Sequence, residues 1–147
     1  MVSSKRHPMT MTAKTGATRD GMLLAMEIKM TGDTGAYASY GPAVITRAMA
    51  HCTGPYNIPN VRADATFVYT NNPMGGAFRG FGVPQVAVCH EGQMNALARE
   101  LGIDPVEIRL KNAHQIGSKL PTGQILENSV GFIDTLKKAQ AKAGEVF

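Results

Sequence analysis

The sequence predicts an α+β fold, in which a β-hairpin and further strands pack against several helices. Two observations predict it. Apolar residues alternate with other residues near the N-terminus, whereas they recur at helical spacing over much of the C-terminal half. The predicted strands and helices do not alternate regularly, which argues against a doubly wound parallel sheet. With 147 residues the chain can bury a sizeable core, and we expect residues 1–147 to form a single domain.

The N-terminal part of the chain predicts the β-hairpin. Residues 9–17 fit one strand, and residues 22–30 alternate as a second strand does. The tripeptide Arg19-Asp20-Gly21 between them is a turn signal. We expect the second strand to turn four side chains toward the core, namely Leu24, Met26, Ile28 and Met30. Residues 32–41, which follow, are rich in turn-forming residues.

Two helices and one further strand follow. Residues 42–52 predict a helix, because proline is tolerated in a first turn and apolar residues recur on one face. Residues 61–70 are rich in valine, threonine and aromatic residues, which is typical of a strand. The most regular helical pattern covers residues 84–101. We expect the hairpin to pack against this helix.

The C-terminal part predicts two more helices around an irregular segment. Gly102 is a C-terminal cap, and Asp104-Pro105-Val106-Glu107 combines an N-cap with a first-turn proline. The helix that this begins should run to about Ala113. Residues 117–128 predict an irregular crossing, and residues 132–143 a final helix.

Composition excludes several function classes. No run approaches the roughly 18 apolar residues of a membrane span. Cys52 and Cys89 are too few for a disulfide scaffold or an iron–sulfur module, so we expect free thiols in a cytoplasmic protein. The four histidines lack metal-ligand spacing, and His90 fits the buried face of a helix. We therefore predict no metal ligand within the chain.

A glycine-rich run at residues 75–84 is the most informative motif. It reads Gly-Gly-Ala-Phe-Arg-Gly-Phe-Gly-Val-Pro and lies between a predicted strand and a predicted helix, where anion-binding loops are common. Glycines let the main chain approach a ligand closely, and arginine carries a rigid fork of donors that suits oxo and phosphate groups. The run matches neither a dinucleotide fingerprint nor a phosphate-binding loop of the Walker type.

This run resembles the signature of the xanthine dehydrogenase family of molybdenum hydroxylases. The resemblance extends to Arg6-His7-Pro8 and Arg47, and to residues 32–37, 56–62 and 104–112. It covers about residues 5–140 and is similar to an interior portion of that family's large molybdopterin-binding subunit. It implies that the chain is part of the molybdenum-cofactor-binding domain of that family.

The resemblance assigns roles to specific residues. It implies that the molybdenum–molybdopterin cofactor, in its plain or its cytosine dinucleotide form, contacts Gly76, Ala77, Phe78, Arg79 and Gly80. It also implies that Arg47 and Phe81 contact the substrate. Arg47 would stabilise negative charge on a heterocycle, and Phe81 would pack on the ring of that heterocycle. From its local sequence alone, we expect the Phe78 side chain to lie in the core.

The family hydroxylates N-heterocycles or aldehydes with water-derived oxygen. Its catalytic base is a glutamate in a segment with no counterpart in this chain, so we expect no catalytic residue here and no activity of the isolated chain. The partners implied are complementary molybdenum-subunit segments, iron–sulfur and FAD subunits, and a small-molecule substrate, with self-association of the chain alone.

A non-catalytic remnant of such a subunit is the alternative function. A basic nucleic-acid-binding domain is less favoured, because the net charge of +4 is scattered.

Overall fold

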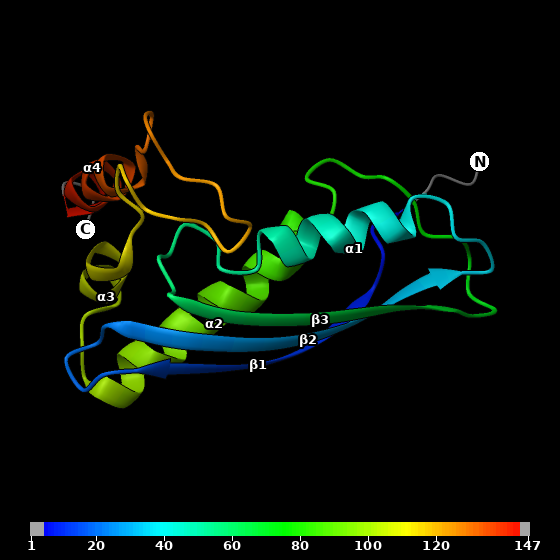
Figure 1. Cartoon of the computed structure of the whole chain (residues 1–147), viewed down its shortest axis with the longest axis horizontal. Helices are drawn as coiled ribbons and strands as arrows, with labels where there is room; N and C mark the ends of the chain where they lie inside the picture. Colours follow the sequence, from blue (N-terminus) through cyan, green and yellow to red (C-terminus); the bar gives the residue numbers. More distant parts are fainter. Residues whose placement is uncertain (1–4, 145–147) are drawn as a thin grey trace.

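A computed structural model describes residues 5–144 of the protein as a two-layer α+β fold (Figure 1). Three strands form one mixed sheet in the order β1-β2-β3, and four helices accompany it within the described residues. The elements in chain order are β1 (Met9–Ala17), β2 (Leu23–Gly35), α1 (Gly41–Ala50), β3 (Asn60–Tyr69), α2 (Val83–Leu101), α3 (Pro105–Asn112) and α4 (Phe132–Gly144). The predicted α+β class is confirmed.

The sheet combines a hairpin with one parallel strand. β1 and β2 pair antiparallel across a turn that contains the predicted Arg19-Asp20-Gly21 signal, where the Thr18 N–H donates to the Met22 carbonyl at 2.9 Å. β3 then pairs parallel to β2, and α1 forms the crossover that such a pairing requires. β2 is therefore the central strand.

A bulge at the start of β2 changes which leucine is buried. The register between β1 and β2 shifts at Gly16/Ala17, so Ala17 pairs with Leu23 while Gly16 pairs with Ala25. An extra residue on one strand moves the side chains beyond it to the opposite face. Leu23 is consequently 2% exposed and Leu24 48% exposed. The prediction that Leu24 faces the core is wrong.

The central strand also continues farther than its sequence suggests. β2 runs on to Gly35, although residues 32–41 were expected to be turns. Gly32 pairs with Met9 on one side and Phe67 on the other, and the Phe67 ring fills the space where a Cβ would stand. Pairing on both edges outweighs the low strand propensity of glycine.

α1 and α2 cover the same face of the sheet. α1 packs on β3 and β2, and α2 packs on β1 (Figure 1). The core between the layers joins the inward side chains of β2 to those of both helices, including Met26, Ile28, Ile45, Ala48, Val86 and Met94. The predicted packing of the hairpin against the residues 84–101 helix is confirmed.

The helix ends follow the capping signals. Gly102 ends α2 in the left-handed conformation with φ of 66°. The Asp104 carboxylate accepts hydrogen bonds from the Val106 and Glu107 amides at the start of α3. α4 forms where predicted, yet none of its described residues is buried. α4 contacts α3, and its Phe132 packs against the core, with its ring 5.9 Å from the Tyr56 ring.

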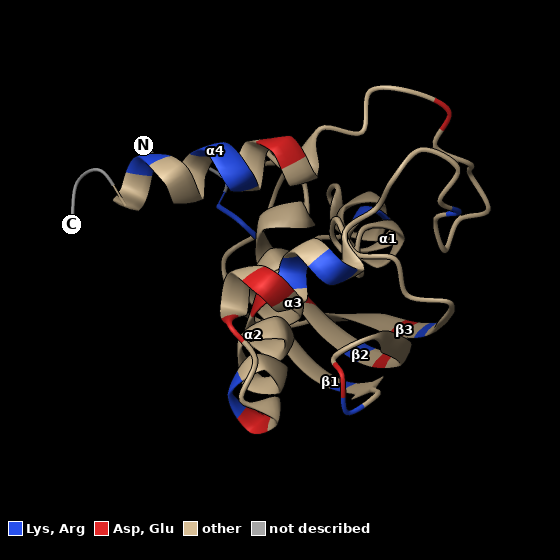
Figure 2. Ribbon diagram, turned by 90° about the vertical axis from the view of Figure 1, so that its left-hand side faces the viewer, with Lys and Arg blue, Asp and Glu red and all other residues tan. Residues whose placement is uncertain are grey.

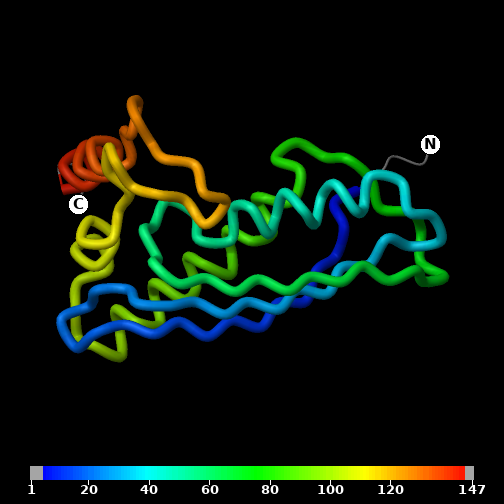
Figure 3. The backbone as a smooth tube through the Cα atoms, in the orientation of Figure 1, coloured from blue at the N-terminus to red at the C-terminus, as the bar shows by residue number. Residues whose placement is uncertain are grey.

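The two ends of the molecule are built differently (Figure 3). One end holds the hairpin turn, α3 and α4. The other end gathers the segment that precedes β1, the start of α1 and the glycine-rich loop that leads from β3 to α2. Segments far apart in sequence therefore meet at the loop. Among the helices of residues 5–144, none has the length and apolar character needed to cross a membrane.

Three buried histidines are expected to make the fold less stable in acid. His7, His90 and His114 are each at least 94% buried, and burial lowers the pKa of all three below the ordinary value of 6.5. As pH falls from 6.5 toward these lowered values, the unfolded chain binds more protons than the folded one. We therefore expect the free energy of unfolding to decrease from pH 7 to pH 5.

Denaturant titrations at several pH values would measure this slope. Replacing one buried histidine, as in His114→Gln, should flatten it by removing one titrating group. A free energy of unfolding that is constant or rises on acidification over this range would contradict the expectation.

Candidate functional site

The glycine-rich loop adopts a backbone that few sequences allow. Gly80, Phe81 and Gly82 have φ of 94°, 50° and 98°, so three consecutive residues are in the left-handed half of conformational space. Glycine reaches these values freely, whereas phenylalanine does so at a cost of about 1–3 kcal/mol. Such strain in one residue, held between two glycines, is typical of functional loops.

Gly82 also lets α1 pack directly on the loop. A Cβ at Gly82 would lie 2.3 Å from the Val44 carbonyl oxygen and 3.2 Å from the Ala48 Cβ. No side chain fits that space. The glycine therefore sets the distance between the loop and the helix that carries Arg47.

The loop keeps a row of unused hydrogen-bond donors. Within residues 5–144, four consecutive backbone N–H groups donate to no acceptor, those of Ala77, Phe78, Arg79 and Gly80. The neighbouring Gly76 is buried, and its N–H donates to the Lys5 carbonyl at 3.0 Å. Consecutive free amides in a glycine loop before a helix form a site that suits an anionic, oxygen-rich group.

Arg79 is exposed at the tip of this loop. Its guanidinium makes no hydrogen bond or ion pair among the described residues, while its carbonyl accepts one from Arg6 Nη1 at 2.7 Å. The backbone is thus anchored and the charged fork is left for a ligand.

The two loop phenylalanines differ in environment. Phe81 is half-buried and meets the Tyr40 ring edge-on, with centroids 6.0 Å apart. Phe78 is 51% exposed and stacks under the Arg6 guanidinium at 4.4 Å. The expectation that Phe78 lies in the core is wrong, because Arg6 rather than the apolar interior covers its ring.

Arg47 lies on the exposed side of α1. Val44, Ile45 and Ala48 of the same helix are buried, so the helix is amphipathic as predicted. The close approach of α1 to Gly82 brings the arginine's helix against the loop. No hydrogen bond joins Arg47 to the loop within the described residues, so its side chain is free to meet a ligand.

The segment before β1 supports the loop from beneath, which the sequence patterns did not predict. Lys5 pairs with Gly75, and Gln85 Nε2 donates to the His7 carbonyl at 3.4 Å. A Cβ at Gly75 would lie 2.7 Å from His7 Cδ2, so ring and loop are in close contact. The Arg6-His7-Pro8 tripeptide marked this segment, but nothing local in it points to residues 70 positions away.

An acidic residue fixes the entry to the loop. The Asp33 carboxylate accepts hydrogen bonds from Thr70 Oγ1 at 2.7 Å, Asn72 Nδ2 at 2.6 Å and the Gly35 amide at 2.7 Å. These donors hold the pKa of Asp33 below its usual value. Burial lowers the pKa of nearby His7, and the negative charge of Asp33 opposes that shift.

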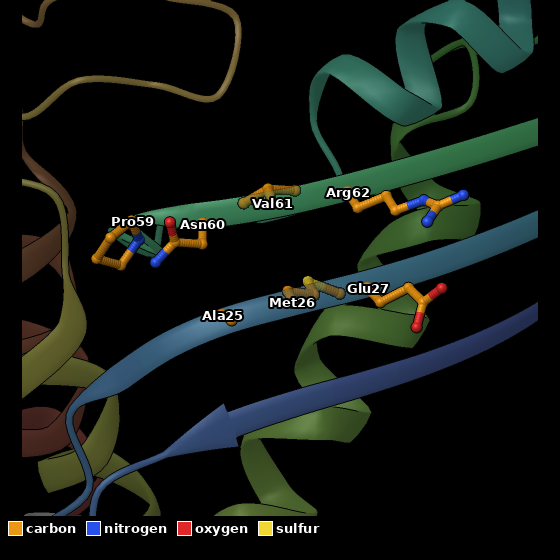
Figure 4. A pocket seen from close by; sticks show the side chains of 7 residues that line it. All are labelled: Ala25, Met26, Glu27, Pro59, Asn60, Val61 and Arg62. Atoms are coloured by element: carbon orange, nitrogen blue, oxygen red, sulfur yellow. The ribbon is translucent and has the colours of Figure 1, made fainter.

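Other surface features carry less chemistry. A groove of about 590 Å³ lies over β2 and β3, where Glu27 and Arg62 come from paired positions (Figure 4). It contains none of the predicted site residues. In the ribbon view of Figure 2, positions of Lys and Arg are interspersed with positions of Asp and Glu along the helices and strands. Residues 5–144 contain no group of three His, Cys, Asp or Glu side chains placed to hold a metal ion.

Comparison with known proteins converges on one family. The family profile of the molybdopterin cofactor-binding domain matches residues 1–113. The chain is 74% identical over 145 residues to the nicotinate dehydrogenase large molybdopterin subunit of Eubacterium barkeri, covering 99% of this chain and 34% of that protein. It is 43% identical over 150 residues to a probable xanthine dehydrogenase subunit of Bacillus subtilis, covering 95% and 20%.

The fold agrees with a solved structure of the same kind. Aldehyde oxidoreductase from Desulfovibrio gigas superposes with a TM-score of 0.90 at 40% identity, over 95% of this chain and 15% of that one. The chain thus spans about a third or less of the relatives it matches.

Proposed function

Because the chain belongs to the molybdopterin cofactor-binding domains of the xanthine dehydrogenase family, we propose that it forms part of the molybdenum-binding subunit of a hydroxylase. The reaction is the hydroxylation of an N-heterocycle or aldehyde with oxygen derived from water. The 74% identity to a nicotinate dehydrogenase subunit favours a nicotinate-like heterocycle.

The observation that carries the proposal is the row of free amides in the glycine loop. Four consecutive N–H groups, beside a guanidinium that has no partner among residues 5–144, fit the phosphate and oxo oxygens of a molybdopterin. The assigned contacts are Gly76, Ala77, Phe78, Arg79 and Gly80. When bound, the cofactor supplies oxygen transfer and accepts two electrons. The chain itself binds the cofactor's oxygens and shapes one wall of its site.

Two further side chains are assigned to the substrate. Phe81, fixed by its strained backbone and by Tyr40, offers an aromatic surface for a planar ring. Arg47, on the helix packed against Gly82, would stabilise negative charge that develops on the heterocycle. The loop thus divides into a cofactor part and a substrate part.

Exposed apolar surface supports the proposed partners. Large side chains are solvent-exposed near the loop end of the molecule, including Tyr37, Tyr40, Val68, Tyr69, Met74 and Phe78. Such surfaces usually belong to interfaces. We propose that complementary molybdenum-subunit segments cover them, with iron–sulfur and FAD subunits completing a cytoplasmic assembly. In the chain alone the same surface would promote self-association.

Metal and pterin analysis tests the proposal. The chain, purified together with complementary segments, should contain molybdenum and a pterin, and released nucleotide would identify the cytosine dinucleotide form. The chain purified alone should not hydroxylate nicotinate, xanthine or an aldehyde, because none of the residues assigned here to the cofactor or the substrate is a general base. An assembly without molybdenum would point to the non-catalytic remnant instead.

Arg79→Ala should reduce cofactor retention. The substitution removes the one guanidinium assigned to the cofactor and leaves the loop backbone unchanged. Charge-assisted hydrogen bonds contribute roughly 1.5–3 kcal/mol, so we expect about tenfold or greater loss of bound molybdenum at limiting cofactor. Molybdenum analysis after dialysis measures it. Full occupancy in the variant would show that the Arg79 guanidinium does not hold the cofactor.

A further inference from the structure

We propose that Arg6 is a positioning residue that holds the loop in the shape in which its free amides meet the cofactor. The inference rests on the proposed function, but it concerns a residue outside the glycine-rich run. Arg6 is 73 positions from Arg79 in the sequence, and the structure places its guanidinium on two consecutive loop residues.

The two contacts of Arg6 act on different parts of the loop. Its Nη1 donates to the Arg79 carbonyl at 2.7 Å, and its guanidinium carbon lies 4.4 Å from the centre of the Phe78 ring. A planar guanidinium can stack on a ring while donating from its edge, which an ammonium group cannot do in the same way. Backbone and side chain of the loop are therefore held by one group.

Hydrogen bonds on both sides of Arg6 fix the position of its backbone. On one side of it, the Lys5 carbonyl accepts from the Gly76 amide at 3.0 Å; on the other, the His7 carbonyl accepts from Gln85. The His7 side chain is 1% exposed and packs edge-on against Phe67 at 5.1 Å. The short segment is thus tied to the base of the loop and to α2.

Peptide geometry links this anchor to the free donors. The carbonyl of Arg79 and the N–H of Gly80 belong to one planar trans peptide, so they point in opposite directions. Holding the carbonyl on Arg6 aims the Gly80 N–H away from Arg6. This N–H is among the four that donate to no acceptor within residues 5–144. Arg6 thereby orients a donor that it does not touch.

Hydrogen exchange tests the positioning role without cofactor. The Phe81 amide donates to the Phe78 carbonyl at 2.8 Å and the Val83 amide to the Gly80 carbonyl at 3.1 Å, so both report on the loop. Arg6→Ala should accelerate exchange at these two amides by about tenfold, the change expected for one lost hydrogen bond to a charged donor. Arg62→Ala, which removes an exposed arginine from β3, is the matched control.

Cofactor retention in the complete assembly provides the second readout. We expect Arg6→Ala to lose molybdenum about tenfold more readily than the wild type while its melting temperature falls by only about 5 °C or less. Arg6→Lys should recover part of the retention by donating to the Arg79 carbonyl. Unchanged exchange at Phe81 and Val83 would overturn the positioning role. Normal molybdenum retention in Arg6→Ala, combined with loss of molybdenum in Arg79→Ala, would also overturn the positioning role. That outcome would leave the proposed function intact. Wild-type protein without molybdenum would refute the proposed function, and the exchange measurement would still decide the role of Arg6 in the loop.

Discussion

Arg47→Ala is expected to slow turnover of the assembled enzyme by roughly 100- to 1000-fold, the usual cost of removing one donor that stabilises charge in a transition state. Arg47 is exposed on α1, and the backbone of that helix touches the loop at Gly82. The assigned partner is the substrate rather than the cofactor, so molybdenum content should not change. Steady-state kinetics on a heterocycle, together with metal analysis, measures both quantities.

Two companion variants sharpen the Arg47 experiment. Arg19→Ala removes an exposed arginine at the hairpin turn, at the opposite end of the molecule, and should behave as wild type. Arg47→Lys keeps the charge but loses the forked geometry, and an intermediate rate is expected. If Arg47→Ala loses molybdenum while Arg79→Ala retains it, the two arginines have the opposite roles to those proposed.

Much of the fold was predictable because local signals and tertiary contacts agree. The hairpin turn and the cap of α3 each combine a strong local pattern with the packing that the structure adopts. The errors in the predicted fold arise where the pairing between strands determines which side chains are buried. The bulge that buries Leu23 and exposes Leu24 depends on the register with β1, which one strand's alternation does not contain.

The glycine-rich loop of the candidate site was predictable from the sequence, whereas the contacts that hold the loop in place were not. Glycines around Arg79 and Phe81 predict a loop whose backbone is open to a ligand, and the family resemblance proposes roles that residue types alone leave open. The stacking of Phe78 under Arg6 was missed, because a contact between residues 72 positions apart leaves no local pattern. The same holds for Gln85, whose donor reaches the His7 carbonyl.

Asn112 connects α3 to the hairpin turn through its side chain and to Asn57 through its backbone carbonyl. Its Oδ1 accepts from the Leu23 amide at 2.8 Å, and its Nδ2 donates to the Gly21 and Ile108 carbonyls, each at 2.8 Å. Its own carbonyl accepts from the Asn57 amide at 2.8 Å. The residue is 2% exposed, so it fixes the hairpin turn on α3 in the interior.

Asn112→Leu should therefore be the most destabilising single substitution that we predict. The leucine would leave the Leu23 amide and the Gly21 carbonyl buried without a partner, at about 1–3 kcal/mol each. We expect the free energy of unfolding to fall by roughly 2–6 kcal/mol and the melting temperature by about 10 °C or more. Thermal and denaturant unfolding measure both. Asn71→Leu, at an exposed position in the loop after β3, is the matched control and should change stability little. Equal melting temperatures for the two variants would mean that the buried amide of Asn112 does not hold the turn, because an unpaired donor and acceptor in the interior cannot be silent.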